Sequence, residues 1–160
     1  MKKVLLIVGS AGIAFLLIKS FKSKSKSKKM FTEQDAKEAI LAVQKSYGRE
    51  MASTIEKMLR LETNHFKSKQ YQLTGSAGME VGKWKAIPKD ATNGTVKMND
   101  ADLSDGTDEF IKWKSVKDFC FFLAEYINRY KGNFARWYSV QKEGQKTYAD
   151  KINSVKSKFV

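Results

Sequence analysis

Apolar residues recur every three to four positions through most of the chain beyond its first thirty residues, which is the spacing of helices that bury one face. The pattern predicts a first helix over residues 32–46, which begins at the capping-box-like "TEQD" and ends at Gly48. A second helix is predicted over roughly residues 50–65. Within it, Ser53 and Glu56 have the spacing of a capping box, in which a serine caps the helix and a glutamate bonds back.

One acid interrupts the apolar stripe of the second helix. Ile55, Met58 and Leu59 lie on this stripe, and Glu62 follows seven residues after the first and four after the second. A carboxylate on a buried face costs free energy unless it is paired or held neutral. Position alone leaves two interpretations open. Glu62 is either a helix-end residue bonded to a nearby lysine or backbone amide, or a carboxyl whose pKa is raised so that it can donate a proton.

The middle of the chain lacks the helical period of the segments on either side of it. The segment "KSKQYQLTGSAGME" is polar and contains glycines, so we expect a loop that leads into a short segment near Met79. Asn93-Gly94 then lies between "KAI" and "TVKM", and Asn-Gly is the strongest short hairpin signal. We therefore expect a small β lobe or irregular insertion around this pair.

The clearest helical period follows Ser115, which opens the capping sequence "SVKD", and it ends at Gly132. Its apolar face comprises Phe119, Phe122, Leu123, Tyr126, Ile127 and Tyr130. A short helical piece is predicted at "FARWYSVQK", and a closing helix at "TYADKINSVKSKF". The face of that closing helix comprises Tyr148, Ile152, Val155 and Phe159. The pattern as a whole predicts a mainly α (α+β) domain over residues 31–160.

The N-terminal segment has a separate character. Residues Val4 to Ile18 form a charge-free run, and the following "KSFKSKSKSKKM" offers no small-residue cleavage site. We expect a single transmembrane anchor at residues 1–18, with the lipid contact through residues 4–18. A flexible Ser/Lys-rich linker is expected at residues 19–30, where the lysines would also contact anionic lipid headgroups.

Charge is concentrated in the same N-terminal segment. The net charge is +13 at pH 7, but residues 1–29 hold eight lysines and no acid, which leaves +5 on residues 30–160. Mild basicity of the folded part does not indicate nucleic-acid binding, so we expect no nucleic acid among the partners.

Cysteine and histidine usage limits the chemistry further. Cys120 is the single cysteine and His65 the single histidine, so neither an intramolecular disulfide nor a His/Cys zinc site is possible. Cys120 lies within "DFCFFLAEY" and is expected to be a small buried core residue. We expect no metal and no cofactor.

The order of these elements resembles the plan of lysozyme-like cell-wall lytic enzymes. Glu62-Thr63 and "GSAGME" at residues 75–80 resemble the lytic transglycosylase signature, in which Glu-Ser is followed by a Gly-Ala-x-Gly-Leu-Met-Gln-like segment. "FIKWKS" at residues 110–115 and the later "TYADKI" are similar to segments of the bacterial glucosaminidase family. The likeness spans roughly residues 32–159. It departs from the family pattern at Thr63, at "NHF" where Gly-Trp is common, and at "QKT" in place of Asp-Pro.

This resemblance implies a lysozyme-like fold and a membrane-anchored glycosidase that cleaves peptidoglycan glycan strands, either a glucosaminidase or a lytic transglycosylase. Local cell-wall opening would be its task, as in bacteriophage entry or lysis. Glu62 is the expected general acid. An inverting hydrolase also needs a second carboxylate, whereas a transglycosylase needs none because the 6-hydroxyl of its substrate attacks.

Glu80 is the second expected catalytic residue, and further candidate acids are Asp100, Asp102, Asp105, Asp108 and Glu109. The expected substrate-binding residues are Tyr71, Ser76, Trp84, Tyr138 and Tyr148.

Other interpretations stay open from the sequence. A non-enzymatic, membrane-tethered cell-wall-binding or assembly protein would keep the fold without the chemistry. A tethered polyanion binder would use the Ser-Lys tract. The lysines also create a conflict of orientation, since six follow the predicted span and two precede it, which favours a cytoplasmic domain. A wall-directed domain needs the opposite side of the membrane, or a virion membrane.

Overall fold

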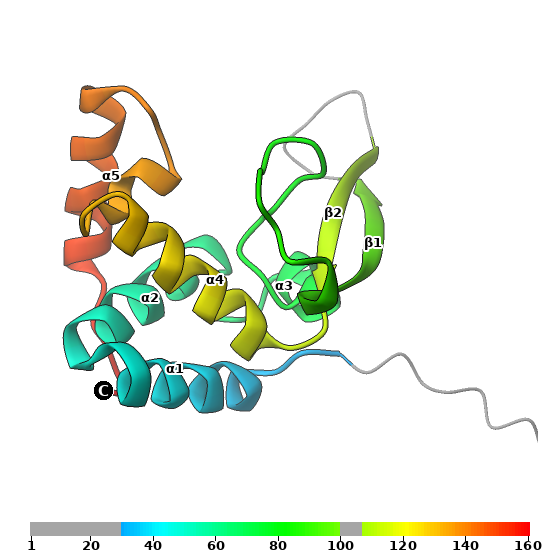
Figure 1. Cartoon of the computed structure of the whole chain (residues 1–160), viewed down its shortest axis with the longest axis horizontal. Coiled ribbons are helices and arrows are strands. Elements are labelled where there is room, and N and C mark those ends of the chain that lie inside the picture. Colours follow the sequence, from blue (N-terminus) through cyan, green and yellow to red (C-terminus); the bar gives the residue numbers. More distant parts are fainter. Residues whose placement is uncertain (1–29, 100–106) are drawn as a thin grey trace, which may run out of the picture.

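The computed structural model describes residues 30–99 and 107–160, and the described part has an α+β fold, as expected (Figure 1). The helices are α1 Glu33–Tyr47, α2 Arg49–Glu62, α3 Lys69–Thr74, α4 Val116–Arg129 and α5 Lys142–Ser154, with 3₁₀ turns η1 Lys89–Ala91 and η2 Phe134–Trp137. The strands are β1 Thr92–Asn99 and β2 Thr107–Trp113. Four longer helices form one side of the molecule, and the sheet with α3 forms the other (Figure 1).

The start of α1 confirms the predicted capping box. The Thr32 backbone N–H donates to the Asp35 carboxylate at 2.8 Å, and the Asp35 N–H donates to the Thr32 hydroxyl at 3.2 Å. The predicted cap of α4 is also present, because the Asp118 N–H donates to the Ser115 hydroxyl at 3.1 Å. Helices α1 and α4 therefore begin at the capping residues that the sequence predicts.

The predicted cap within the second helix is wrong. α2 begins directly after Gly48, which has φ +89° and ends α1 as well. Ser53 therefore lies inside the helix, where its hydroxyl is 2.9 Å from that of Ser157. Glu56 is fully buried instead of lying in an exposed first turn. A glycine with positive φ lets the chain turn so sharply that α2 needs no loop before it.

The Asn93-Gly94 pair lies inside β1 and does not form the hairpin turn. The strands are antiparallel, with Thr92 opposite Trp113 and Thr95 opposite Ile111. Three steps along β1 therefore match two along β2, which is the count of a β-bulge. Gly94 has φ +78°, so its left-handed conformation serves this bulge. The connection between the strands falls within residues 100–106, outside the described residues.

The closing helix begins earlier and ends earlier than predicted. α5 starts at Lys142 and stops at Ser154, so Phe159 lies in an extended tail. The tail N–H groups at Lys158 and Phe159 bond the Glu56 carboxylate. These bonds replace the helical bonds that a longer α5 would have made.

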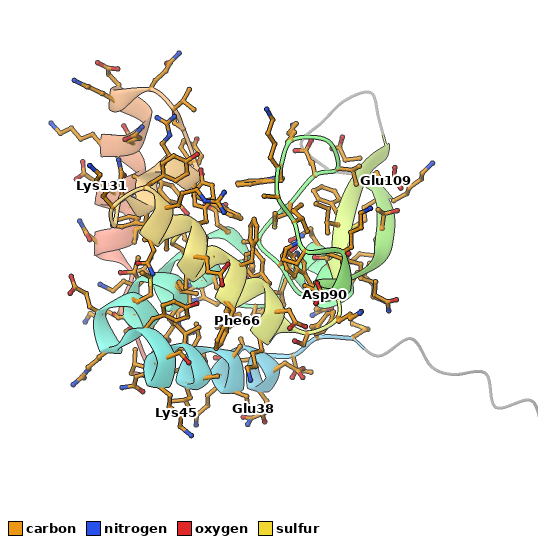
Figure 2. All side chains as sticks on the ribbon, viewed as in Figure 1. Glu38, Lys45, Phe66, Asp90, Glu109 and Lys131 are labelled. Atoms are coloured by element: carbon orange, nitrogen blue, oxygen red, sulfur yellow. The ribbon has the colours of Figure 1, made fainter. Side chains whose placement is uncertain are left out.

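The core lies where α4 crosses α1 and α2. α4 buries Phe119, Phe122, Leu123 and Ile127 of the face predicted for it, whereas Tyr126 is half-buried and Tyr130, just beyond the helix, is exposed. Trp113 at the end of β2 packs edge-on against Phe119 with ring centroids 5.5 Å apart. Cys120 is fully buried, as predicted, and burial raises the pKa of its thiol. Figure 2 shows Phe66 inside the molecule and Glu38 and Lys45 on the outer side of α1.

The predicted anchor, and all but the last residue of the predicted linker, lie outside the described residues. Among the helices in residues 30–99 and 107–160, none has the length and apolar character needed to cross a membrane.

Candidate functional site

An open pocket of about 630 Å³ lies between the helical side and the loop that follows α3. Its walls come from four segments: the end of α2 at Glu62, the loop within residues 77–85, the last turns of α4, and residues 136–140. Segments distant in sequence therefore meet at one concave surface, the usual setting of a ligand site.

Glu62 is held at this surface by the end of α2. The next residue, Thr63, is fully buried, and its hydroxyl donates to the Leu59 carbonyl at 2.5 Å while accepting from the Phe66 N–H at 2.8 Å. Asn64, His65 and Phe66 then all have positive φ, between 47° and 68°. Left-handed backbone is unfavourable for residues other than glycine. Thr63 thus fastens a strained turn immediately after the candidate acid.

The pKa of Glu62 is raised above the ordinary glutamate value. Burial of its carboxyl among pocket atoms is the main cause, and it outweighs the Tyr148 hydroxyl and the Lys151 ammonium, which both lower the pKa. The helix dipole acts in the same direction as burial, because the last turn of a helix disfavours negative charge. Glu62 still has exposed surface at the pocket. It therefore combines proton retention with access to a ligand.

Tyr148 lies beneath the pocket and faces Glu62. Its ring stacks on Tyr138 with centroids 4.9 Å apart and an angle of 2°. Its hydroxyl is buried, and burial raises the pKa of the phenol, as does the Glu62 carboxyl through its charge and through hydrogen bonding with the hydroxyl. The interaction is mutual, since the Tyr148 hydroxyl lowers the pKa of Glu62 by acting as a donor to its carboxyl.

Aromatic rings line the rest of the pocket. Trp84 lies against Trp137 with centroids 4.1 Å apart, and Tyr126 meets both rings edge-on at 5.8 and 5.7 Å. Tyr138 is 59% exposed at the rim. Exposed aromatic surface beside a concave site is suited to the apolar faces of sugar rings.

Glu80 lines the same pocket from a different element. The chain around it runs beside β2, since the Val81 N–H donates to the Glu109 carbonyl and the Ile111 N–H donates to the Met79 carbonyl, both at 2.8 Å. The Glu80 carboxylate accepts from the Lys83 ammonium at 2.5 Å. The predicted pair of acids therefore shares one pocket, with Glu80 paired to a cation.

Two predicted substrate-binding residues lie in the core and not in the pocket. Tyr71 is fully buried, and its hydroxyl donates to the Thr32 carbonyl at 2.7 Å. Ser76 is also fully buried, 3.1 Å from the Thr74 hydroxyl. Tyr71 lies in α3, a helix where the sequence predicted a loop, and Ser76 follows the Gly75 that ends this helix. The polar, glycine-bearing sequence did not reveal that this segment packs inward.

Other predicted acids and ligands lie elsewhere. Asp100, Asp102 and Asp105 fall outside the described residues. Asp108 and Glu109 do not line the pocket, and Glu109 accepts a hydrogen bond from Thr95. In the part of the chain that the structure describes, no cluster of His, Cys, Asp and Glu side chains could hold a metal ion.

Several pocket residues were not predicted from the sequence. Arg129 is the last residue of α4, Tyr130 caps it, Arg136 lies in η2, and Lys83 and Lys85 lie in the loop. The periodicity placed Tyr130 on the apolar face of the helix, whereas it is 37% exposed. For the others, only the folding of the loop and η2 onto α4 brings them together.

A scan against protein-family models, a search of curated proteins and a search of solved structures each found no match for this chain. Function is therefore inferred from the chemistry of the pocket, together with the motif resemblance around Glu62.

Proposed function

We propose that the chain is a membrane-anchored glycosidase with a lysozyme-like fold, which cleaves peptidoglycan glycan strands with Glu62 as general acid. The observation that carries this proposal is the Glu62 carboxyl, which has a raised pKa and lies in an open pocket lined with aromatic rings. Cleavage of a glycosidic bond needs a proton for the leaving oxygen, and a carboxyl whose pKa is raised is suited to supply it.

The surrounding residues support the same chemistry. Rings such as Trp84 and Tyr138 would stack on sugar faces and hold the strand across Glu62. Glu80, paired with Lys83, could stabilise positive charge on the sugar or activate water. In a lytic transglycosylase, Glu62 would also accept the proton of the attacking 6-hydroxyl after giving up its own.

Tyr148, which lies beneath the pocket, would assist proton transfer by Glu62. Its hydroxyl donor faces the Glu62 carboxyl, so it can bond the carboxylate that remains after proton transfer. This bond would stabilise the product state of Glu62 more than its protonated ground state.

The test is digestion of purified peptidoglycan by the full chain in detergent, with products identified by mass spectrometry. Wild type would be compared with Glu62→Gln and with Glu125→Gln, a control that removes an exposed carboxylate of α4 outside the pocket. We expect cleavage to be lost only in Glu62→Gln. Products ending in 1,6-anhydro sugars indicate a transglycosylase, and reducing ends indicate a hydrolase.

A second candidate is a wall-binding protein without activity. The exposed rim residues Tyr138 and Val140, 59% and 71% accessible, favour it because they would bind a glycan whether or not it is cut. Binding of peptidoglycan without products from the wild type would establish this candidate and overturn the enzyme.

A further inference from the structure

The pocket contains more positive than negative charge. Four cations line it, from Lys83, Lys85, Arg129 and Arg136, together with the two carboxylates of Glu62 and Glu80. Only Lys83 forms an ion pair with either acid in the described residues, so three cations face the pocket without a carboxylate partner.

Arg136 has the features of a residue held for a ligand. Its guanidinium lies over the Tyr130 ring, 5.2 Å from the centroid, so stacking restricts its orientation. Its Nε–H is buried and has no hydrogen-bond partner among the described residues. Its own backbone carbonyl accepts from the Tyr126 hydroxyl at 3.2 Å, which ties η2 to α4. A buried donor left unpaired in the free protein is satisfied when a ligand supplies the acceptor.

The cations come from three separate elements around one concavity. Arg129 ends α4, Arg136 belongs to η2, and Lys85 belongs to the loop after α3. Because three elements carry them, their convergence follows from tertiary structure and not from a single basic run. Arginine offers paired donors in a planar fork that matches a carboxylate or phosphate.

We propose that this group of residues, Lys85, Arg129 and Arg136, forms a subsite for an oxyanion attached to the glycan strand. The ligand is a carboxylate or a phosphate carried as a substituent near the bond that Glu62 would cleave. This inference rests on the proposed function for its substrate, and it adds that acidic strands are preferred over neutral ones. A neutral N-acetylglucosamine polymer offers stacking surface to the aromatic rings but leaves these cations unpaired.

The test compares ligands that differ only in charge. The full chain carrying Glu62→Gln is titrated with soluble, uncross-linked peptidoglycan strands, which have free peptide carboxylates, and with the same strands after carbodiimide amidation. We expect amidation to weaken binding about tenfold, since a charged hydrogen bond contributes roughly 1.5–3 kcal/mol. A chito-oligosaccharide should bind as weakly as the amidated strand. Strands treated with hydrofluoric acid to remove phosphates separate the two sources, because tight binding then persists only if the anion is a carboxylate.

Variants assign the effect to the subsite. In Arg136→Gln, the ratio between native and amidated strands should fall from about tenfold to less than twofold. Arg136→Lys keeps the charge and should restore part of the ratio even if the stacking on Tyr130 is lost. Arg49→Gln removes an exposed arginine at the start of α2, outside the pocket, and should leave the ratio unchanged.

The outcomes distinguish this inference from the proposed function. Equal binding of native strands, amidated strands and strands treated with hydrofluoric acid would overturn the subsite, even if wild type cleaves peptidoglycan. Charge-dependent binding that Arg136→Gln abolishes would support the subsite, even if wild type yields no products. An unchanged ratio in Arg136→Gln and in the matching Arg129→Gln would also overturn it.

Discussion

The backbone N–H of Lys158 donates a 2.8 Å hydrogen bond to the buried carboxylate of Glu56, which lies 102 residues earlier in the chain. The same carboxylate accepts from the Phe159 N–H and, at 2.7 Å, from Arg60 Nε. Arg60 is itself 2% exposed, and its guanidinium lies 4.5 Å from the centroid of the Phe159 ring. The C-terminal tail is thereby fastened to α2, beside which Figure 1 places the C-terminus.

The hydrogen bonds between the C-terminal tail and α2 also help to position two residues of the candidate site. α2 carries Glu62 at its end, and α5, which precedes the tail, carries Tyr148. The bonds between the tail and Glu56 fix one helix against the other. They therefore help to hold the phenol of Tyr148 opposite the carboxyl of Glu62.

Replacing Glu56 by alanine should destabilise the fold strongly. The change removes the acceptor for two tail N–H groups and leaves the buried Arg60 guanidinium with only a 3.5 Å contact to the exposed Glu33 carboxylate. Breaking a buried ion pair by removing one partner costs about 3–5 kcal/mol. Urea unfolding followed by circular dichroism would measure the loss. Glu50→Ala, an exposed position on the same helix, is the matched control and should change the free energy of unfolding by less than about 0.5 kcal/mol. A loss below about 1 kcal/mol in Glu56→Ala would contradict this role.

The Glu56 network marks the limit of what helical periodicity predicts. The apolar stripes gave the positions of α1, α2 and α4 because each helix buries one face whatever its partner is. Glu56 has the spacing of a capping residue relative to Ser53, so its local sequence favours an exposed position. Its burial depends on a tail about a hundred residues away, and no local pattern contains that information.

The same limit applies to the candidate site, where the sequence predicts some residues and only the tertiary structure places the others. Glu62 could be singled out because an acid on an apolar stripe breaks the pattern, and the structure places it in the pocket. Tyr71 and Ser76 lie in a segment that is polar and glycine-bearing, yet both are buried. The inward packing of α3 against the sheet decides their position. Arg136 joins the pocket only through the docking of η2 on α4.

Thr63→Val should weaken the turn that presents Glu62. Valine has the shape of threonine but neither donates to the Leu59 carbonyl nor accepts from the Phe66 N–H. Two buried hydrogen bonds are lost, so we expect a loss of about 1–3 kcal/mol of unfolding free energy. Thermal unfolding would report the loss. Thr63→Ser keeps the hydroxyl and should retain most of the stability. Equal losses in the two variants would show that the methyl group, and not the hydroxyl, matters.

Tyr138→Ala should weaken glycan binding with little effect on stability. The ring is 59% exposed at the rim, so its removal creates little cavity. Loss of one stacking ring corresponds to about 0.5–1.5 kcal/mol, or roughly a threefold to tenfold rise in dissociation constant. Calorimetric titration of the Glu62→Gln chain with a chito-oligosaccharide would measure it. Tyr138→Phe keeps the ring and should bind almost normally. Unchanged binding in Tyr138→Ala would exclude this ring from the ligand surface.

Tyr148→Phe should separate stability from activity. The hydroxyl is buried beside the Glu62 carboxyl, and the loss of this one interaction should lower the unfolding free energy by no more than about 1 kcal/mol. Turnover of peptidoglycan should nevertheless fall, because the carboxylate formed at Glu62 loses the donor that faces it. Measuring kcat beside the unfolding free energy tests both parts. A variant destabilised by far more than this would show that the hydroxyl has a further partner, and full turnover would show that it has no role in the reaction.

The raised pKa of Glu62 predicts the direction in which the free energy of unfolding changes with pH. Below the pKa of glutamate in the unfolded chain, about 4.3, the acid is neutral in both states and contributes no difference. As the pH rises through that value, the unfolded state ionises first, while the folded state resists ionisation because the pocket raises its pKa. Ionisation of Glu62 therefore favours unfolding, and the penalty is complete once the pH exceeds the folded-state pKa.

Glu62→Gln removes this penalty, since glutamine has no proton to lose. Relative to wild type, the variant should match its stability near pH 4 and exceed it increasingly towards pH 7. Urea unfolding of both proteins at several pH values between these limits would measure the difference. Glu125→Gln, which removes an exposed acid of α4, should show no such trend. If Glu62→Gln instead became relatively less stable as the pH rose, the folded-state pKa of Glu62 would be lowered, and the residue could not serve as a proton donor at neutral pH.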